Sequence, residues 1–376
     1  MKSIGVIAEY NPFHNGHLYH LQKIKEMFPK DIVIVVLGGH FMQRGETSII
    51  NKWDKTNLAL TFGADIIIEL PFPFATQSAD FFARGALEIL NYLKVETIVF
   101  GSESNNIELL KETAEKIIID DDKTKIYLDQ GFNYPHALSK SLNINNNPND
   151  ILGITYIKEI IKNEYKINPL TILRTNDYHG KTKYKNMVSA SYIRENYQSN
   201  RIKKYLPKES FELLKSNVSF LDNYFAYLKY QIIINLNQLD IFQGVDEGIE
   251  NRIKKYIFEV NSIKELIGKI KCKRYTYNRI QRMLTHILCG FTKEDSKELK
   301  KIKYLRVLGF NKKGQTYLNK IKKETEIPIV TNLSKHKDPM LDLELKTTKI
   351  YSLIFNETYQ NLLIKKEYNN LPLKRD

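Results

Sequence analysis

The chain of 376 residues is 42% hydrophobic, which allows two domains with ordinary cores. Its two cysteines, Cys272 and Cys289, are too few for a disulfide framework and are not at metal-binding spacing, so a cytoplasmic protein without a signal peptide or membrane span is expected. The charge is uneven, because residues 1–200 hold 22 Lys and Arg against 23 Asp and Glu, whereas residues 201–376 hold 35 against 20. The basic second part predicts a polyanionic partner, and a lysine-rich solvated surface is the plain alternative.

The first predicted strand covers residues 4–7 and leads into a histidine motif. Its side chains are mostly apolar and β-branched, and Asn11-Pro12 ends the extended run. His14 and His17 follow on either side of Gly16, where an amphipathic helix begins. Free backbone N–H groups and the helix dipole favour a phosphate there, and histidine donors suit the charge that develops on an α-phosphate during displacement. In the alternative interpretation, both histidines are ordinary polar residues of a loop and a first helical turn.

Four more strands are predicted, at residues 31–37, 64–71, 96–100 and 170–174, with helical patterns that include 52–62 and 79–93. Continuous apolar runs that alternate with helices are typical of an α/β fold with a Rossmann-like, doubly wound parallel sheet. Ligands bind such sheets at the carboxyl ends of the strands. Polar or small residues follow each predicted strand, so a nucleotide crevice is expected at that edge.

A second motif with phosphate-binding chemistry lies near residue 190. Ser189 and Ser191 can cap a helix and present hydroxyl groups, and Arg194 follows one turn later. Hydroxyls, helix N–H groups and a guanidinium together favour the β- and γ-phosphates of a nucleotide. A simple helix cap with a surface arginine is the alternative.

Beyond residue 200 the pattern is mainly helical, over residues 208–235, 246–270, 275–290 and 293–303. The chain is therefore divided into residues 1–200, an α/β catalytic domain, and residues 201–376, a mainly α-helical basic domain. Cations mixed with aromatic rings in one stretch of the second part predict contact with RNA, because cations meet phosphates and rings stack on unpaired bases. The expected RNA-binding residues are Lys271, Lys273, Arg274, Tyr275, Tyr277, Arg279 and Arg282. The alternative is an amphipathic helix whose tyrosines pack inward.

The H-x-G-H pattern after the first strand resembles the adenylyl-transferring nucleotidyltransferase superfamily. A closer resemblance, to the bacterial tRNA(Met) cytidine acetate ligase family, extends over nearly the whole chain. It rests on residues 5–17 (GVIAEYNPFHNGH), 41–46 (FMQRGE), 63–71 (GADIIIELP), 100–103 (FGSE), 151–154 (ILGI), 273–277 (KRYTY) and 306–311 (RVLGFN).

This resemblance implies an ATP-dependent ligase that works in two steps. ATP and acetate would form acetyl-adenylate and pyrophosphate. The acetyl group would then pass to the N4 amine of the wobble cytidine of elongator tRNA(Met), giving N4-acetylcytidine. Mg²⁺ is expected with the phosphates, without an all-protein metal site, and no stable protein partner is expected.

The resemblance also implies residue roles. His14 and His17 would be catalytic at the phosphates, and Arg44 would meet the carboxylate of acetate in a loop that also holds Gln43 and Glu46. Gly101 would leave room for the adenine or ribose. The expected ATP-binding residues are Ile7, Ala8, Glu9, Tyr10, Asn11, Pro12, Phe13, His14, Asn15, Gly16, His17, Leu18, Tyr19, His20, Gly101, Asn149, Arg174, Ser189, Ser191 and Arg194. Asp150 stands where the family usually has a second Asn, which leaves its part in nucleotide binding open.

Two other classes of protein remain open at this point. A small-molecule adenylyltransferase of the same fold would not need a long basic second part. A non-catalytic RNA-binding protein would not need both histidines, Ser189 and Arg194.

Overall fold

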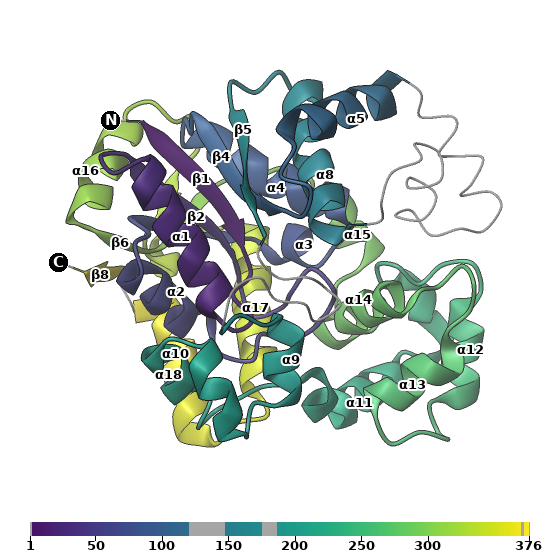
Figure 1. Cartoon of the computed structure of the whole chain (residues 1–376). Helices are drawn as coiled ribbons and strands as arrows, with labels where there is room; N and C mark the ends of the chain where they lie inside the picture. The colour runs from purple at the N-terminus through teal and green to yellow at the C-terminus, as the bar shows by residue number, and fades with distance from the viewer. Residues whose placement is uncertain (1, 120–146, 175–185, 370–371, 376) are drawn as a thin grey trace.

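The computed structural model describes residues 2–119, 147–174, 186–369 and 372–375. Within these residues, eight strands form one sheet in the order β5-β4-β1-β2-β3-β6-β7, with β8 beside β6 (Figure 1). The five predicted strands are confirmed and run parallel. They are β1 (Ser3–Ala8), β2 (Ile32–Gly38), β3 (Ile66–Leu70), β4 (Thr97–Ser102) and β5 (Asn168–Leu173).

The order of these strands places a topological switch point beside β1. From β1 the chain continues to β2 and β3 on one side of the sheet, and it then returns to β4 and β5 on the other. Such a reversal is the point where open α/β sheets bind ligands, outside the carboxyl ends of the strands. All residues of β2 and β3 are buried, as the continuous apolar runs predict for parallel strands covered on both faces.

Helices connect the strands and pack against them. The helices of this part are α1 (Asn15–Met27), α2 (Lys52–Thr61), α3 (Phe72–Ala75), α4 (Ala79–Tyr92), α5 (Ile107–Ile119), α8 (Pro148–Lys162) and α9 (Ala190–Glu195). The predicted helices at 52–62 and 79–93 are thus confirmed as α2 and α4. Helices α4, α5 and α8 pack together next to β4, and the short α9 lies near the start of α1 (Figure 1).

The segment from residue 200 to 298 is mainly helical, as expected, but the predicted segments 208–235 and 246–270 are each divided into separate helices, and the one at 293–303 ends at residue 298. Its elements are η1 (Asn200–Tyr205), α10 (Lys208–Leu213), η2 (Leu221–Tyr224), α11 (Phe225–Ile234), η3 (Leu236–Ile241), α12 (Ile249–Tyr256), α13 (Ile263–Ile270), α14 (Tyr277–Cys289) and α15 (Lys293–Glu298). Helices α11 to α14 form a group of their own at one end of the molecule (Figure 1). Its core is the apolar face of each helix, for example Leu266, Ile267 and Ile270 of α13.

The last part of the chain returns to the sheet, which the helical pattern does not predict. Strand β6 (Leu305–Asn311) pairs antiparallel with β3, and β7 (Ile329–Val330) and β8 (Leu373–Arg375) pair with β6. The sheet is therefore mixed. Four apolar residues in seven make β6 a short buried strand, but a run of this length does not by itself identify its partner. The division of the chain at residue 200 stays a prediction. Strands β6, β7 and β8 belong to the second part of the chain but extend the sheet of the first part.

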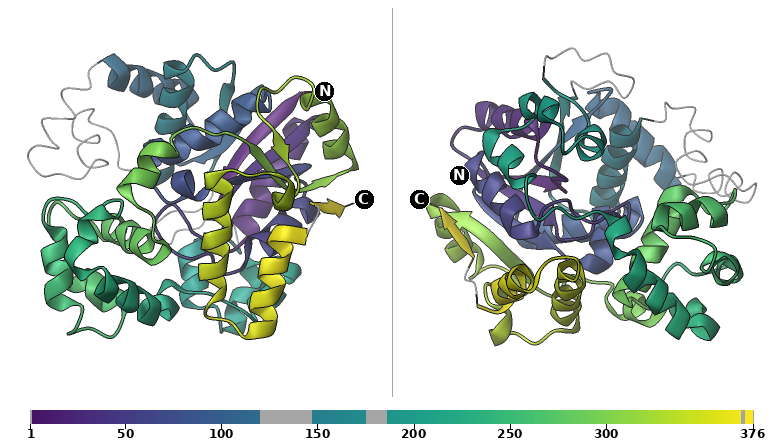
Figure 2. Two further views of the ribbon diagram at one scale, coloured as in Figure 1. Left: turned by 180° about the vertical axis from the view of Figure 1, so that it is seen from behind. Right: turned by 90° about the horizontal axis from the view of Figure 1, so that it is seen from below.

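Helices α16 (Lys312–Ile321), α17 (Pro339–Ser352) and α18 (Glu357–Asn369) and the short η4 (Leu333–Lys335) complete this part. Figure 2 shows α17 and α18 side by side.

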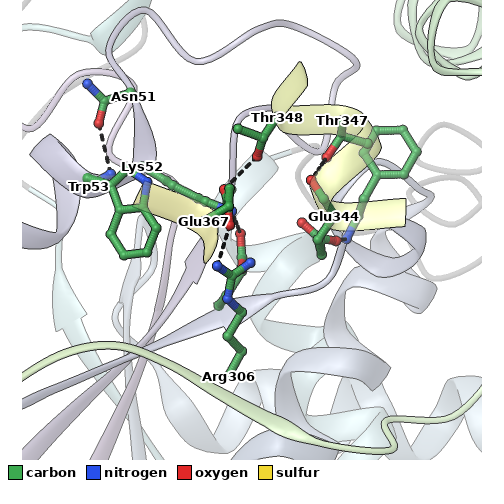
Figure 3. A network of polar contacts seen from close by, with 12 residues as sticks. Asn51, Lys52, Trp53, Arg306, Glu344, Thr347, Thr348 and Glu367 are labelled. Carbon is green, nitrogen blue, oxygen red and sulfur yellow. Dashed lines mark hydrogen bonds and ion pairs between the residues drawn. The ribbon is translucent and has the colours of Figure 1, made fainter. Parts of the chain in front are cut away.

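A buried network of charges joins α17 and α18 to the sheet (Figure 3). The Nζ of Lys52 lies 2.7 Å from both the Oε1 of Glu69 and the Oε1 of Glu367. The guanidinium of Arg306 pairs with the same two carboxylates, 2.8 Å from Glu69. The Oγ1 of Thr348 donates to Glu367 over 2.6 Å. Two cations thus balance two carboxylates, which is the condition under which a buried ion cluster is tolerated.

Glu344 lies beside this balanced network, where a further negative charge is unfavourable. Its carboxylate accepts a hydrogen bond from the backbone N–H of Phe72. Burial, and then the charge of Glu69, raise the pKa of Glu344 to about 8. The carboxyl group is therefore protonated at neutral pH.

This protonation predicts a pH dependence of stability. The unfolded chain releases the proton of Glu344 near pH 4.5, whereas the folded chain keeps it, so folding takes up a proton between the two pKa values. The stabilisation is complete at low pH and declines as the pH rises toward 8. We expect the free energy of unfolding of Glu344→Gln to fall less steeply between pH 5 and 8 than that of the wild type, measured by urea titration. Parallel slopes would contradict the protonated state.

Candidate active site

The two histidines of the motif form a stacked pair at the start of α1. Their ring centroids lie 3.8 Å apart. The Nδ1 of His14 accepts a hydrogen bond from the backbone N–H of Gly16 over 3.0 Å, and the Nδ1 of His17 accepts one from the N–H of His14 over 3.2 Å. A ring nitrogen that accepts carries no proton, so the proton of each neutral ring lies on Nε2. Both rings therefore present an N–H donor.

The electrostatic surroundings keep these rings neutral. Burial, and then the cations Arg174 and Arg194, lower the pKa of His14 to about 3. Burial, followed by the charges of His14 and Arg174, lowers the pKa of His17 well below its usual value. Burial and Arg174 also lower the pKa of His20 to about 4. The pair is thus a set of neutral hydrogen-bond donors and not a pair of imidazolium ions.

The second predicted motif lies next to the first. The Oγ of Ser189 accepts a hydrogen bond from the N–H of Tyr192 and caps α9, as predicted. Arg194 donates from Nη1 to the carbonyl oxygen of Asn11 over 2.8 Å and pairs through Nη2 with Glu46 over 2.7 Å. Its Nη2 also donates to Ser191 over 3.4 Å. Segments 180 residues apart in the chain therefore meet where the expected phosphates would lie.

The end of β4 brings together the predicted residues from α8 and β5. Arg174 donates to the Oδ1 of Asn149 over 2.6 Å, and Asn149 donates in turn to Glu103. A Cβ added to Gly101 would lie 2.9 Å from the Cγ of Arg174. The arginine side chain therefore packs closely against Gly101, and the expected room for adenine or ribose at this glycine stays a prediction.

Asp150 has a structural role at the same strand end. Its Oδ1 accepts hydrogen bonds from the hydroxyl of Ser102 and from the backbone N–H groups of Glu103 and Ser104. The Asp150 side chain is 6% exposed. It therefore holds the turn after β4, which positions Glu103 and through it Asn149.

The loop after β2 connects the strand ends with α14. The backbone N–H of Gln43 donates to the Oε1 of Glu9, and its side-chain Nε2 donates to the carbonyl oxygen of Gln77 over 2.8 Å. On the other side, Gln281 donates to the carbonyl oxygen of Arg44 over 3.0 Å, and Thr285 donates to that of Gly45 over 2.6 Å. Residues 41–46 therefore lie between the histidine motif and the basic helix.

Lys55 holds the ends of β1 and β2 together, a role that sequence analysis missed. Its Nζ donates to the carbonyl oxygens of Glu9, Gly38 and Gly39 over 3.0, 2.7 and 2.7 Å. Burial lowers the pKa of Lys55 to about 7, against the opposing effect of Glu9 and Glu69. Lys55 lies three residues after Lys52 in α2. This spacing does not show which carbonyl groups the side chain of Lys55 contacts, so the sequence alone does not reveal its role.

The predicted tRNA-binding residues lie at the start of α14 and just before it. Lys271, Lys273, Arg274 and Tyr277 are exposed, and Arg279 and Arg282 are half-buried. The prediction for Tyr275 is wrong as regards access, because its side chain is 2% exposed. Its hydroxyl donates to the carbonyl oxygen of Asp246 over 2.6 Å, and the guanidinium of Arg279 lies 4.0 Å from its ring. Tyr275 therefore supports the segment from within and is not available for stacking on a base.

A second group of cations, beside α9, was not predicted. A surface hollow of about 620 Å³ is lined by Tyr192, Asn200, Arg201, Lys203, Lys204 and Tyr205. Asn15, the first residue of α1, donates to the carbonyl oxygen of Lys204 over 2.9 Å and so fixes this hollow next to the histidine motif. The sequence signal is the basic run at residues 201–204, which begins seven residues after Arg194.

Metal ligands and membrane spans were searched within the described ranges. No three His, Cys, Asp or Glu side chains gather there in a way that could hold a metal ion. None of the helices in those ranges is both long and apolar enough to cross a membrane.

Comparison with known proteins identifies the class of this fold and site. The family model "HIGH Nucleotidyl Transferase" matches residues 1–366. A crystal structure of Thermotoga maritima TmcAL bound with alpha-thio ATP superposes with a TM-score of 0.89, at 32% identity and over 100% of both chains. The sheet, the histidine pair and these matches define a nucleotidyl transferase.

Relatives in sequence narrow this class further. The tRNA(Met) cytidine acetate ligase of Caldicellulosiruptor saccharolyticus is 40% identical over 97% of each chain. Those of Bacillus subtilis and Clostridium perfringens (strain SM101) are 38% and 42% identical, over 100% and 94% of this chain and 98% and 96% of theirs. The chain belongs to the tRNA(Met) cytidine acetate ligase family.

Proposed function

We propose that this chain activates acetate with ATP and acetylates the N4 amine of the wobble cytidine of elongator tRNA(Met). The observation that carries the proposal is the docking of the 41–46 loop between the histidine pair and α14. It joins a site suited to nucleotide phosphates to a basic surface suited to RNA. Membership of the ligase family, over nearly the full chain, selects this reaction among those of the class.

In the first step, an acetate oxygen attacks the α-phosphorus of ATP, and pyrophosphate leaves with the electrons of the broken P–O bond. The Nε2–H groups of His14 and His17 would donate to the α-phosphate as its charge grows. Ser189, Ser191 and Arg194 would hold the pyrophosphate, and Arg44 would orient the acetate. No covalent nucleophile is required, because positioning and charge stabilisation account for such a step.

Nucleotide binding would also use the polar chain at the end of β4. Arg174 and Asn149 would contact ATP there, since their mutual hydrogen bond holds both at the crevice. Mg²⁺ would enter with the phosphates of ATP, since no metal-binding cluster is found in the described residues. The ion would neutralise part of the phosphate charge.

The test of this function is transfer of radiolabelled acetate to purified tRNA, with and without ATP. Parallel reactions contain elongator tRNA(Met), another tRNA, or no tRNA. We expect ATP-dependent label on elongator tRNA(Met) alone. ATP consumption with acetate but no labelled tRNA would favour a small-molecule adenylyltransferase. Binding of tRNA without any turnover of ATP would favour an RNA-binding protein.

The exposed cations before α14 are expected to contribute to tRNA affinity. Lys273→Ala together with Arg274→Ala should weaken tRNA binding roughly tenfold and flatten its salt dependence by about 1.5 units of the log–log slope, because two phosphate contacts are lost. The measurement is filter binding at about 50 to 300 mM salt, because salt cations compete strongly with Lys and Arg for the RNA phosphates in this range. The matched control is Lys322→Ala with Lys323→Ala, an exposed pair at the end of α16. Equal effects of both pairs would contradict a specific surface.

A further inference from the structure

Glu9 lies where the acetyl-adenylate and the tRNA would meet in the proposed reaction. It directly follows β1 and lies between that strand and the 41–46 loop. Its Oε1 accepts the backbone N–H of Gln43 over 2.5 Å. Among the described residues, no hydrogen bond reaches its Oε2. The side chain is half-buried, so a bound substrate can reach this oxygen.

The other carboxylates around the crevice have charged or multiple polar partners. Glu46 pairs with Arg194 over 2.7 Å. Glu103 accepts from Asn149 through Oε1 and from the N–H of Asp150 through Oε2. An ion-paired or fully hydrogen-bonded carboxylate is a poor proton acceptor, because its partners stabilise the ionised form. Glu9 therefore differs from Glu46 in having no ion pair among the described residues, and from Glu103 in having an oxygen that accepts no hydrogen bond there.

An unpartnered hydrogen-bond donor lies on the other side of Gln43, in the connection between α3 and α4. The side chain of Gln77 is 7% exposed, and its Nε2 has no hydrogen-bond partner among the described residues. Gln43 contacts both Glu9 and the carbonyl oxygen of Gln77, so these residues are neighbours. A cytosine presents an amine donor next to a ring acceptor along one edge, and a carboxylate is complementary to that amine.

We propose that Glu9 accepts the proton that the cytidine N4 amine loses when it attacks the acetyl-adenylate, an inference that rests on the function proposed above. The N4 lone pair forms the bond to the acetyl carbon. The bond from that carbon to the phosphate oxygen breaks, and AMP leaves with its electrons. One N4 proton passes to the Glu9 carboxylate, which later releases it to water.

Burial and the charges around Glu9 together raise its pKa, which makes the carboxylate a stronger base. Burial raises the pKa of Glu9, whereas the hydrogen bond from Gln43 and the charge of Lys55 lower it. Glu46 raises the pKa further and Arg44 lowers it, and the carboxylate also interacts electrostatically with Tyr156 of α8. Since a base must be ionised, transfer is expected to slow as the pH falls through the raised pKa.

The two steps can be measured separately, which makes the inference testable. Acetate-dependent exchange between ATP and pyrophosphate reports the first step, and single-turnover transfer from preformed acetyl-adenylate to tRNA reports the second. Glu9→Gln should slow transfer about 100-fold or more while exchange falls less than about tenfold. It should also remove the decline of transfer at low pH. Glu9→Asp keeps a carboxylate and should recover part of the rate together with that decline.

The matched control is Glu26→Gln, an exposed glutamate of α1, which should leave both steps unchanged. Equal losses in exchange and transfer for Glu9→Gln, an unchanged transfer rate, or no recovery with Glu9→Asp would each overturn the role of Glu9. Absence of transfer by the wild type would instead overturn the proposed function. The two failures are thus distinguishable.

Discussion

His17→Ala should lower the rate of acetyl-adenylate formation by about 100-fold or more, because one preorganised donor to the α-phosphate is lost. The donor is preorganised in this chain because the Nδ1 of His17 accepts from the backbone of His14 and so directs the ring proton to Nε2. The measurement is acetate-dependent ATP–pyrophosphate exchange. Affinity for tRNA should stay within about twofold, since the basic segment before α14 is untouched.

The pH profile separates a neutral donor from an imidazolium. Because the pKa of His14 is lowered to about 3 and that of His17 is also lowered, neither ring changes its charge near neutrality. The value of kcat/KM for ATP reports the free enzyme, so it should show no histidine inflection between pH 5.5 and 8, around the ordinary histidine value. A loss of activity as the pH rises through that value would indicate that a charged ring is needed.

A matched control for this variant is His336→Ala, since His336 lies on the C-terminal part of the chain next to Tyr304. It should leave the exchange rate unchanged. A His17→Ala protein that exchanges at the wild-type rate, or that loses tRNA affinity as strongly as exchange, would contradict the separation of the two surfaces.

Glu367→Gln should destabilise the folded protein by about 3–5 kcal/mol, because it leaves buried cations without full compensation. Lys52, Arg306, Glu69 and Glu367 have side chains that are at most 3% exposed. Despite burial, which acts in the opposite direction, Arg306 and Lys52 hold the pKa of Glu367 below its usual range. The amide of glutamine keeps the shape of the side chain but removes the charge.

Urea titration measures this loss as a shift of the unfolding midpoint. Glu212→Gln is the surface control, since its partner Lys215 is exposed and lies one helical turn away. That variant should not shift the midpoint measurably, because exposed ion pairs contribute little. A loss below about 1 kcal/mol for Glu367→Gln would mean that the network is not what fastens α18 to the sheet.

Much of the active site could be predicted because its signals are local in the sequence. Apolar runs identify the five parallel strands, and a loop with His14, Gly16 and His17 before a helix predicts an anion site from neighbours along the chain alone. The meeting of Arg194 with the histidine motif was also predicted, because both motifs carry groups suited to the phosphates of one nucleotide. The catalytic roles of these residues remain predictions.

Other features depend on contacts between distant segments, and the sequence does not reveal them. The sequence pattern allows Tyr275 to lie on a buried face of a helix, and it allows residues 305–311 to form a strand. It does not show which other segment packs against either of them. Arg306 and Glu367 meet Lys52 and Glu69 only because β6 and α18 pack against β3 and α2.

The amino-acid sequence by itself thus determined the parallel sheet and the two phosphate motifs, since each depends on neighbours along the chain. Only the tertiary structure decided which carboxylates are neutralised and which, like Glu9, keep an available oxygen. It also decided that the 41–46 loop docks on α14. The physical reason is that the charge and burial of a side chain depend on every segment packed around it, and these segments are far apart in the sequence.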